Sequence, residues 1–246
     1  KRYFLKKDIA QFDRYKYALD DEFRALQTSF FDLVYTRYLE RRNETKSFYL
    51  EILAKPFDFN KKEEINVDYE NQQYPSTLRL KVEKWRKQLK LSTLNILHSK
   101  LEEEEKLAAK DESYVPKTFE VLEKEAREIT KENMENYFSL MEDVREEDWF
   151  GSYLNAFVTQ FDPHSVYFAP VDKDRFDASM SGKYEGIGAR LTKRNQAIKI
   201  VDVISGGPIW RDKSIEVGDQ IMMVRQEEGD PVDVQSMRLD LSLIHI

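Results

Sequence analysis

Apolar side chains in the first part of the chain recur at the i, i+3, i+4, i+7 spacing of amphipathic helices. One such series covers residues 23–34 and predicts a helix that begins at Asp20 or Asp21. A second helix is predicted between Thr45, as its N-cap, and Pro56, which ends it. Many of these positions are Tyr or Phe, whose simplest role at helical spacing is to fill a core. The pattern therefore predicts a multi-helix unit that serves as a scaffold or a docking domain.

More helices are predicted on either side of a long connection without periodicity, residues 57–75. Asp8 is expected to cap a short helix near the start of the chain. Ser76 opens a long apolar series that continues either directly or after a break. Pro116 suits the first turn of the next helix, and Asp148 begins the last one.

The pattern changes beyond Gly151, where strand-like segments and turns replace the helical series. Residues 186–192 and 197–204 predict two strands joined by a polar, hairpin-like connection. The sequence Gly206-Gly207-Pro208 predicts a turn followed by a short helix, and a turn at residues 217–219 leads into an apolar strand at 221–224.

Composition supports this division into two regions. The chain has 246 residues, of which 35% are charged, and none of its eight glycines precedes Gly151. Glycine costs about 1 kcal/mol relative to alanine inside a helix, so its absence favours long helices. A hydrophobic content of 41% is enough to bury a core and argues against global disorder.

The same numbers exclude several classes of function. A net charge of −7 with no evident basic face argues against a nucleic-acid partner. The sequence contains no run of about 18 apolar residues, so it predicts no membrane-spanning helix. The lack of cysteine excludes disulfides, thiol catalysis and cysteine-based zinc sites.

No catalytic motif is recognisable in the sequence. The zinc-protease pattern H-E-x-x-H, the nucleophile-elbow pattern G-x-S-x-G and the phosphate-binding loop are all absent. His98, His164 and His245 lie far apart in sequence, so we expect no metal site and no cofactor. His164 follows Asp162-Pro163, and a hydrogen-bonded structural role suits it better than proton transfer.

One pattern carries binding chemistry. Two glycines alternate with apolar residues where the first strand begins, and such backbone can point successive N–H groups at an anion. A peptide's terminal carboxylate would suit these donors while the peptide adds as a further strand. Glycines also flank strands that bind nothing, so the order of the later turns is what makes this pattern specific. The candidate peptide-binding residues are Gly186, Ile187, Gly188, Ala189, Arg190 and Leu191.

Further motifs extend along nearly the whole chain in a fixed order, namely Arg2-Tyr3-Phe4-Leu5, Trp85-Arg86-Lys87-Gln88-Leu89, Leu154-Asn155-Ala156-Phe157, Asp162-Pro163-His164-Ser165-Val166-Tyr167-Phe168, Tyr184-Glu185-Gly186-Ile187-Gly188-Ala189 and Met237-Arg238-Leu239-Asp240. This series resembles the tail-specific branch of the carboxy-terminal processing peptidases. The resemblance implies an α+β protein with a helical N-terminal domain over 1–160, a junction over 161–180 and an incomplete PDZ domain over 181–240. That domain would be a small antiparallel β-sandwich or barrel with helices. Residues 241–246 are interpreted as a foreign or read-through tail.

The resemblance also implies a function. Such enzymes are serine endopeptidases of the periplasm or cell envelope, and their PDZ domain binds the apolar C-terminal tails of protein substrates. Hydrolysis there uses a Ser/Lys pair without a metal, in a domain that follows the PDZ domain. No catalytic residue is therefore assigned in this chain, which is expected to be an inactive N-terminal fragment whose signal peptide lies outside it. An envelope adaptor protein is a further partner that the resemblance allows.

Two departures from the family pattern bear on the site. Lys213 stands where many relatives have glycine, which predicts strain if a left-handed conformation is needed. Ala189 replaces the large aromatic of many other PDZ domains and predicts a roomier pocket. The alternative interpretation is a non-catalytic adaptor, in which the helical domain docks a partner and the PDZ domain holds a C-terminus.

Overall fold

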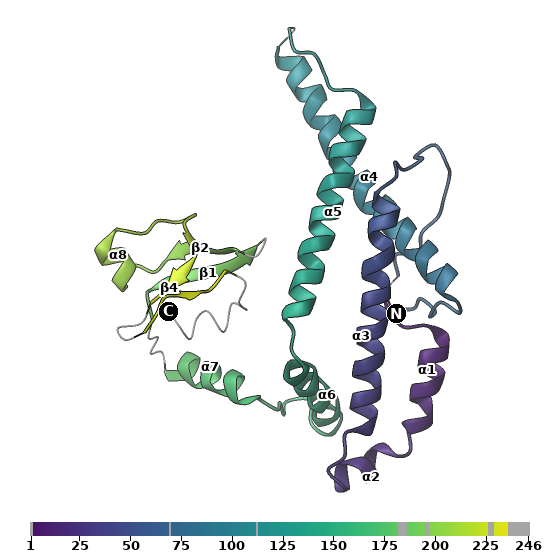
Figure 1. The fold of residues 1–246 in the computed structure, drawn as a ribbon, viewed down its shortest axis with the longest axis vertical. Helices are drawn as coiled ribbons and strands as arrows, with labels where there is room; N and C mark the ends of the chain where they lie inside the picture. Colours follow the sequence, from purple (N-terminus) through teal and green to yellow (C-terminus); the bar gives the residue numbers. More distant parts are fainter. Residues whose placement is uncertain are drawn as a thin grey trace. The chain divides into compact units, whose positions relative to one another are not determined.

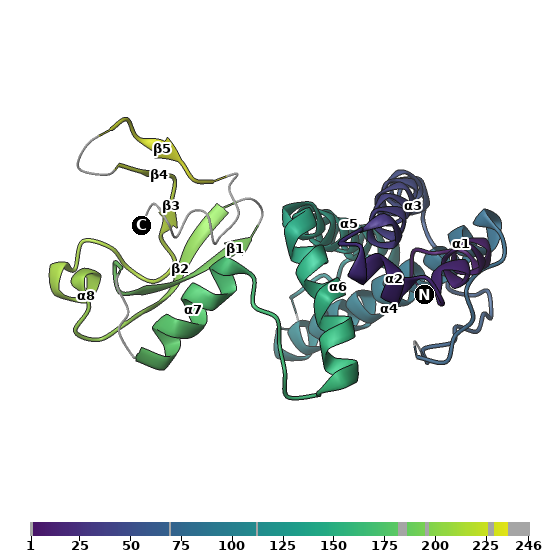
Figure 2. The same ribbon diagram turned by 90° about the horizontal axis from the view of Figure 1, so that it is seen from below.

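The computed structural model describes residues 2–68, 70–111, 113–181, 186–194, 197–225 and 229–235. The chain forms two compact units, Lys1–Phe138 and Ser139–Ile246. The first is helical, and the second combines helices with small antiparallel sheets (Figures 1 and 2). The presence of helices and antiparallel sheets confirms the predicted α+β class. Among the described residues, no helix has the length and apolar character needed to cross a membrane.

Three long helices build the first unit: α3 (Ser29–Leu53), α4 (Leu78–Lys110) and α5 (Phe119–Asp143), the last of which ends in the second unit. Three shorter elements precede them: α1 (Lys6–Phe12), the 3-10 helix η1 (Asp13–Tyr15) and α2 (Leu19–Arg24). Helix α3 packs against both α1 and α4. The described residues of the connection between α3 and α4, which exclude residue 69, contain no regular helix or strand, and this confirms the loop predicted for residues 57–75.

Aromatic and aliphatic side chains from all three long helices form the core. Tyr49 of α3 stacks on Phe138 of α5 with ring centroids 5.0 Å apart, and Leu53 and Leu89 complete this cluster. A second cluster joins Leu97 of α4 to two buried residues of α5, Leu122 and Ala126. The prediction that apolar positions at helical spacing fill a core is confirmed for Leu53, Leu89, Leu97, Leu122 and Ala126, whereas Tyr49 and Phe138 were not among the predicted positions.

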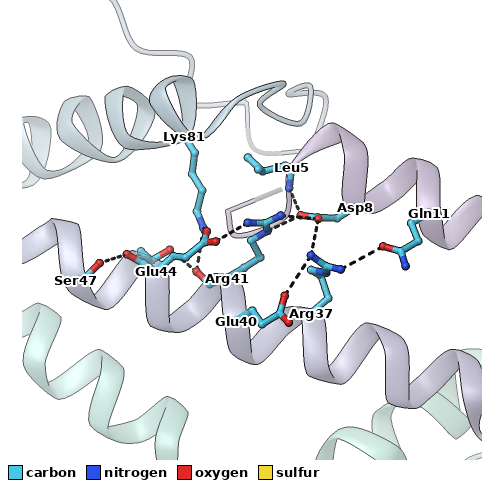
Figure 3. Close-up of polar contacts among 10 residues, drawn as sticks. Leu5, Asp8, Gln11, Arg37, Glu40, Arg41, Glu44, Ser47 and Lys81 are labelled. Carbon is cyan, nitrogen blue, oxygen red and sulfur yellow. Dashed lines mark hydrogen bonds and ion pairs between the residues drawn. The ribbon is translucent and has the colours of Figure 1, made fainter.

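A buried ion network ties α1, α3 and α4 together (Figure 3). Asp8 of α1 is 1% exposed and accepts hydrogen bonds of 2.8 Å from Nε and Nη2 of Arg41 on α3. The backbone N–H of Leu5 donates to the same carboxylate at 2.8 Å. Burial alone would raise the pKa of Asp8, but the bonds from Arg41 and Leu5 outweigh it and lower the pKa.

Lys81 of α4 extends this network. Its side chain is fully buried, and Nζ donates to the carbonyl of Arg41 at 2.9 Å and lies 3.5 Å from a carboxylate oxygen of Glu44. Burial lowers the pKa of Lys81 to about 8, against the opposing attraction of Glu44. Arg41 also bonds to Glu44 through Nη1 at 2.6 Å, so the three helices share one network in which the loss of any charge leaves its buried partners incompletely paired.

The predicted helix over 20–34 is wrong, because the structure divides it. Helix α2 ends at Arg24, Leu26 adopts a left-handed conformation with φ of 54°, and α3 begins at Ser29. Leu26 is 92% exposed, so it does not belong to the apolar stripe that the spacing suggested.

Thr45 is not an N-cap, since α3 continues through it to Leu53. Its hydroxyl is buried and donates to the carbonyl of Arg41 at 2.8 Å, one turn earlier. In α4 the N-cap is Thr77 rather than Ser76, and the helix then continues without a break to Lys110.

Other helix starts also differ from the prediction. Asp8 and Asp148 were expected at helix starts, but each lies in the first turn and accepts a hydrogen bond from a backbone N–H three residues earlier. Pro116 lies in the loop before α5, which begins at Phe119.

The second unit holds α6 (Glu146–Phe161), α7 (Pro170–Ser181) and α8 (Pro208–Asp212). Strands β1 (Ala189–Arg194), β2 (Ala197–Val203) and β3 (Gln220–Ile221) form one antiparallel sheet in that order. Strands β4 (Met223–Val224) and β5 (Val232–Asp233) form another. The strand predicted over 221–224 is therefore split, because Ile221 pairs with β2 whereas Met223 pairs with β5.

The predicted hairpin and the short helix after Pro208 are both present. Helix α7 occupies much of the segment predicted as a junction. The domain boundaries at 160, 180 and 240 stay predictions. The motif at residues 237–240, the proposed tail at 241–246, and residues 182–185 lie outside the described residues.

Candidate peptide-binding site

The candidate residues lie where the chain enters strand β1. This strand pairs with β2 from Ala189 opposite Val203 to Arg194 opposite Ala197. Ile198 and Ile200 of β2 are at most 1% exposed and bury the inner side of the hairpin. The hairpin thereby gives residues 186–191 a fixed support.

Gly188 makes a close approach that excludes any side chain. Its φ is +77°, and an added Cβ would lie 2.9 Å from the Cα of Gly207 and 3.1 Å from Cδ of Pro208. Gly188, directly before β1, therefore needs a glycine at position 207, and Gly207 needs one at position 188. The sequence links these two glycine motifs only by their order, whereas their contact in the structure shows why both glycines are needed.

Backbone hydrogen bonds hold the loop through its carbonyl groups. The N–H of Ile204 donates to the oxygen of Gly188 at 2.8 Å, and the N–H of Ile209 donates to the oxygen of Ile187 at 3.1 Å. By contrast, the N–H groups of Ile187 and Gly188 donate to no described residue. Both residues are partly exposed.

The side chains along the strand differ in exposure. Ile187, Ala189 and Leu191 are partly buried, whereas Arg190 is exposed and has its guanidinium 3.5 Å from the carboxylate of Asp202. A register shift between Arg190 and Leu191 interrupts the alternation of the strand. The predicted apolar pocket beside Ala189 stays a prediction.

Helix α8 supports the loop from the other side. Ile209 is 6% exposed, and its N–H makes the bond to Ile187 described above. The helix ends at Lys213, whose φ of 59° is left-handed. Lys213 therefore has the left-handed conformation that would explain the glycine of many relatives at this position. Because Lys213 carries a Cβ, its backbone is strained at the end of the helix that supports the loop.

The segment after α6 forms a hydrogen-bonded turn. Asp162 accepts bonds from the backbone N–H of His164 at 3.0 Å and from the hydroxyl of Ser165 at 2.5 Å, and these bonds lower the pKa of Asp162. The side-chain amide of Asn155 exchanges two hydrogen bonds with the backbone of Tyr167. Within the described residues, no group of three or more His, Asp or Glu side chains could hold a metal ion.

Comparison with known proteins identifies a similar family and a similar relative. Residues 1–171 match the family described as "Tail specific protease N-terminal domain". The chain is also similar to the tail-specific protease of Haemophilus influenzae, with 27% identity over 238 residues. That alignment covers 96% of this chain but only 31% of the relative, so the chain spans about a third of the relative's length.

Proposed function

Since this chain belongs to the tail-specific protease family, we propose that it contributes substrate selection to a serine endopeptidase that degrades or processes proteins. Residues 186–191 bind the apolar C-terminal tail of a protein substrate. Hydrolysis takes place elsewhere in the protein, on a Ser/Lys pair outside these 246 residues. The family resemblance supports a location in the periplasm or cell envelope.

The unpaired donors at Ile187 and Gly188 are the observation that supports tail binding best. Two adjacent N–H groups that donate to no described residue suit a carboxylate, which accepts several hydrogen bonds at once. The tail would then continue along β1 as an added strand, so that main-chain bonds supply affinity and side chains supply selectivity. Ile187 and Ala189, which are partly buried, would pack against an apolar last residue of the tail.

A pair of peptides tests this proposal. We expect the purified chain to bind a peptide that ends in an apolar residue with a free carboxylate, and to bind its C-terminally amidated form about tenfold more weakly, because the amide lacks the charge that the donors recognise. Isothermal titration calorimetry gives both affinities. Equal affinity for the two forms would overturn carboxylate recognition.

A glycine substitution locates the binding. Gly188→Ala places a Cβ against Gly207 and Pro208 and should abolish binding of the free-acid peptide. Gly229→Ala is the matched control, because Gly229 also has a positive φ, of 133°, but has open space around its Cβ position and lies outside the loop. Loss of binding in both variants would mean general destabilisation rather than a site at Gly188.

A further inference from the structure

A concave site lies in the helical unit, between the connection that follows α3 and the middle of α4. Phe59 and Ile65 line it from the connection, and Leu91 and Leu94 line it from the helix. The cavity has a volume of about 270 Å³. All of its walls belong to the first unit, so it is separate from the loop at residues 186–191.

Lysines of α4 hold the connection in place through its backbone. Nζ of Lys87 donates to the carbonyl of Glu64 at 3.0 Å, and Nζ of Lys90 donates to the carbonyl of Lys61 at 3.3 Å. Lys90 also bonds to the carboxylate of Glu63 at 2.7 Å. The cavity wall is therefore formed before any ligand arrives, which lowers the entropy lost on binding.

The site carries an excess of positive charge. Hydrogen bonds from Arg86 and Lys90 neutralise Glu63 and lower its pKa to about 2. Lys62 pairs with no described residue, whereas Nζ of Lys87 bonds to a carbonyl and its charge also acts on the carboxylate of Glu83, which is not among the lining residues. Glu64 is left as the one acidic side chain among the lining residues that no described cation pairs with. The site is thus basic in a chain whose net charge is −7.

Its floor is apolar and firmly packed. Phe59 packs against the second core cluster, and its ring lies 6.4 Å from that of Phe119 and 6.1 Å from that of Phe57. Leu94 is 42% exposed and presents an aliphatic surface to solvent at the cavity. A volume slightly below the range of about 300–1,000 Å³ found for small-molecule sites suits one or two side chains of a peptide.

We propose that this cavity binds an internal segment of another protein in which an aliphatic side chain is flanked by aspartate or glutamate. The aliphatic group enters between Phe59 and Leu94, and the flanking carboxylates meet Lys62 and Lys87. Charge complementarity selects this occupant, because four lysines and only two glutamates are among the residues that line the cavity around its apolar floor. The site would hold a bound protein at a point distant in sequence from its C-terminal tail.

A capped peptide tests this proposal separately from the proposed function. The probe is a short peptide with one leucine between glutamates, acetylated at its N-terminus and amidated at its C-terminus so that it has no terminal carboxylate for residues 186–191. We expect titration calorimetry to detect binding to the whole chain. A probe with glutamine in place of glutamate should bind about tenfold more weakly, and added salt should weaken the acidic probe.

Variants then place the binding in the cavity. Lys62→Glu should weaken the acidic probe about tenfold without changing thermal unfolding, because Lys62 pairs with no described residue in the folded chain. Leu94→Glu should have a similar effect by placing a charge on the floor. Lys110→Glu is the control, since Lys110 is an exposed lysine at the end of the same helix.

Three results would overturn the proposal: no binding of the capped acidic probe, equal binding of the glutamine probe, or equal loss in the Lys62 and Lys110 variants. Gly188→Ala should leave the capped probe's affinity unchanged. A result that overturns peptide binding in the cavity is therefore distinguishable from a result that overturns tail binding at residues 186–191.

Discussion

At the scale of single residues, two side chains occupy backbone conformations that normally favour glycine. Lys213 ends α8 with φ of 59°, and Leu26 separates α2 from α3 with φ of 54°. A left-handed conformation costs a residue with a Cβ roughly 1–2 kcal/mol. At Lys213 the N–H donates a 2.9 Å hydrogen bond to the carbonyl of Ile209. This bond at the end of the helix offsets part of the strain of the left-handed conformation.

Lys213→Gly should therefore stabilise the second unit by about 0.5–1 kcal/mol, because relief of the strain exceeds the extra entropy of glycine in the unfolded chain. Urea unfolding monitored by fluorescence measures the change. Lys213→Ala is the control, since it removes the charged side chain but keeps the strain. A glycine variant no more stable than the alanine variant would contradict the explanation.

At the scale of elements, the ends and lengths of helices depend on partners that are distant in sequence. Helix α3 continues through Thr45 because its hydroxyl bonds within the helix to the carbonyl of Arg41, which also accepts from Lys81. The first turn of α1 is fixed by Asp8, whose carboxylate joins its own N-cap to α3. One buried network thus sets both the course of α3 and its packing on α1 and α4.

Asp8→Asn should destabilise the helical unit by up to roughly 3–5 kcal/mol near neutral pH, because the buried Nε and Nη2 of Arg41 would lose their carboxylate and only Nη1 would keep one, that of Glu44. Denaturant unfolding measures the difference from the original chain. Asp13→Asn is the matched control on the adjacent 3-10 helix. Its side chain is 68% exposed and pairs with Lys16 at 3.8 Å, so we expect a change below about 1 kcal/mol.

We also expect the effect of Asp8→Asn on the free energy of unfolding to depend on pH. The pKa of Asp8 is lower in the folded chain, so its stabilisation is complete above its unfolded pKa of about 3.9 and is lost as the pH falls through the folded pKa. The difference between the original chain and Asp8→Asn should therefore shrink in acid. A difference that stays constant from about pH 7 to about pH 2 would show that the charge of Asp8 is not the cause.

At the scale of the whole molecule, the chain corresponds to 31% of the length of its Haemophilus relative. Under the proposed function, its two units provide binding surfaces: the loop at residues 186–191 for a terminal carboxylate and the lysine-lined cavity on α4 for an acidic, aliphatic segment. Two such surfaces on one chain would raise the effective concentration of a protein that engages both.

We expect the purified 246-residue chain to hydrolyse no protein, including one that ends in an apolar tail, because the proposed Ser/Lys pair is not among its residues. Incubation followed by mass spectrometry of the substrate checks this. Cleavage that persists after repeated purification would place a catalytic site within the chain and refute the assignment.

The types and order of the elements could be predicted from the sequence. The helical spacing before residue 150 and the glycine-marked strands after it are local patterns, and local backbone preferences decide between helix and strand. The loop over 57–75 and the hairpin entered by Ala189 follow from the same signals. The ordered motifs also pointed to the family that the match over residues 1–171 shows.

Only the tertiary structure decided which residues meet. Nothing local to Asp8 indicates that Arg41, 33 residues later, would neutralise it, and apolar spacing alone placed the exposed Leu26 in a helix. Gly188 and Gly207 likewise become necessary through one close contact between two turns. Periodicity records which face of an element is apolar, whereas the partner of a buried charge or a close backbone contact depends on how distant elements pack together.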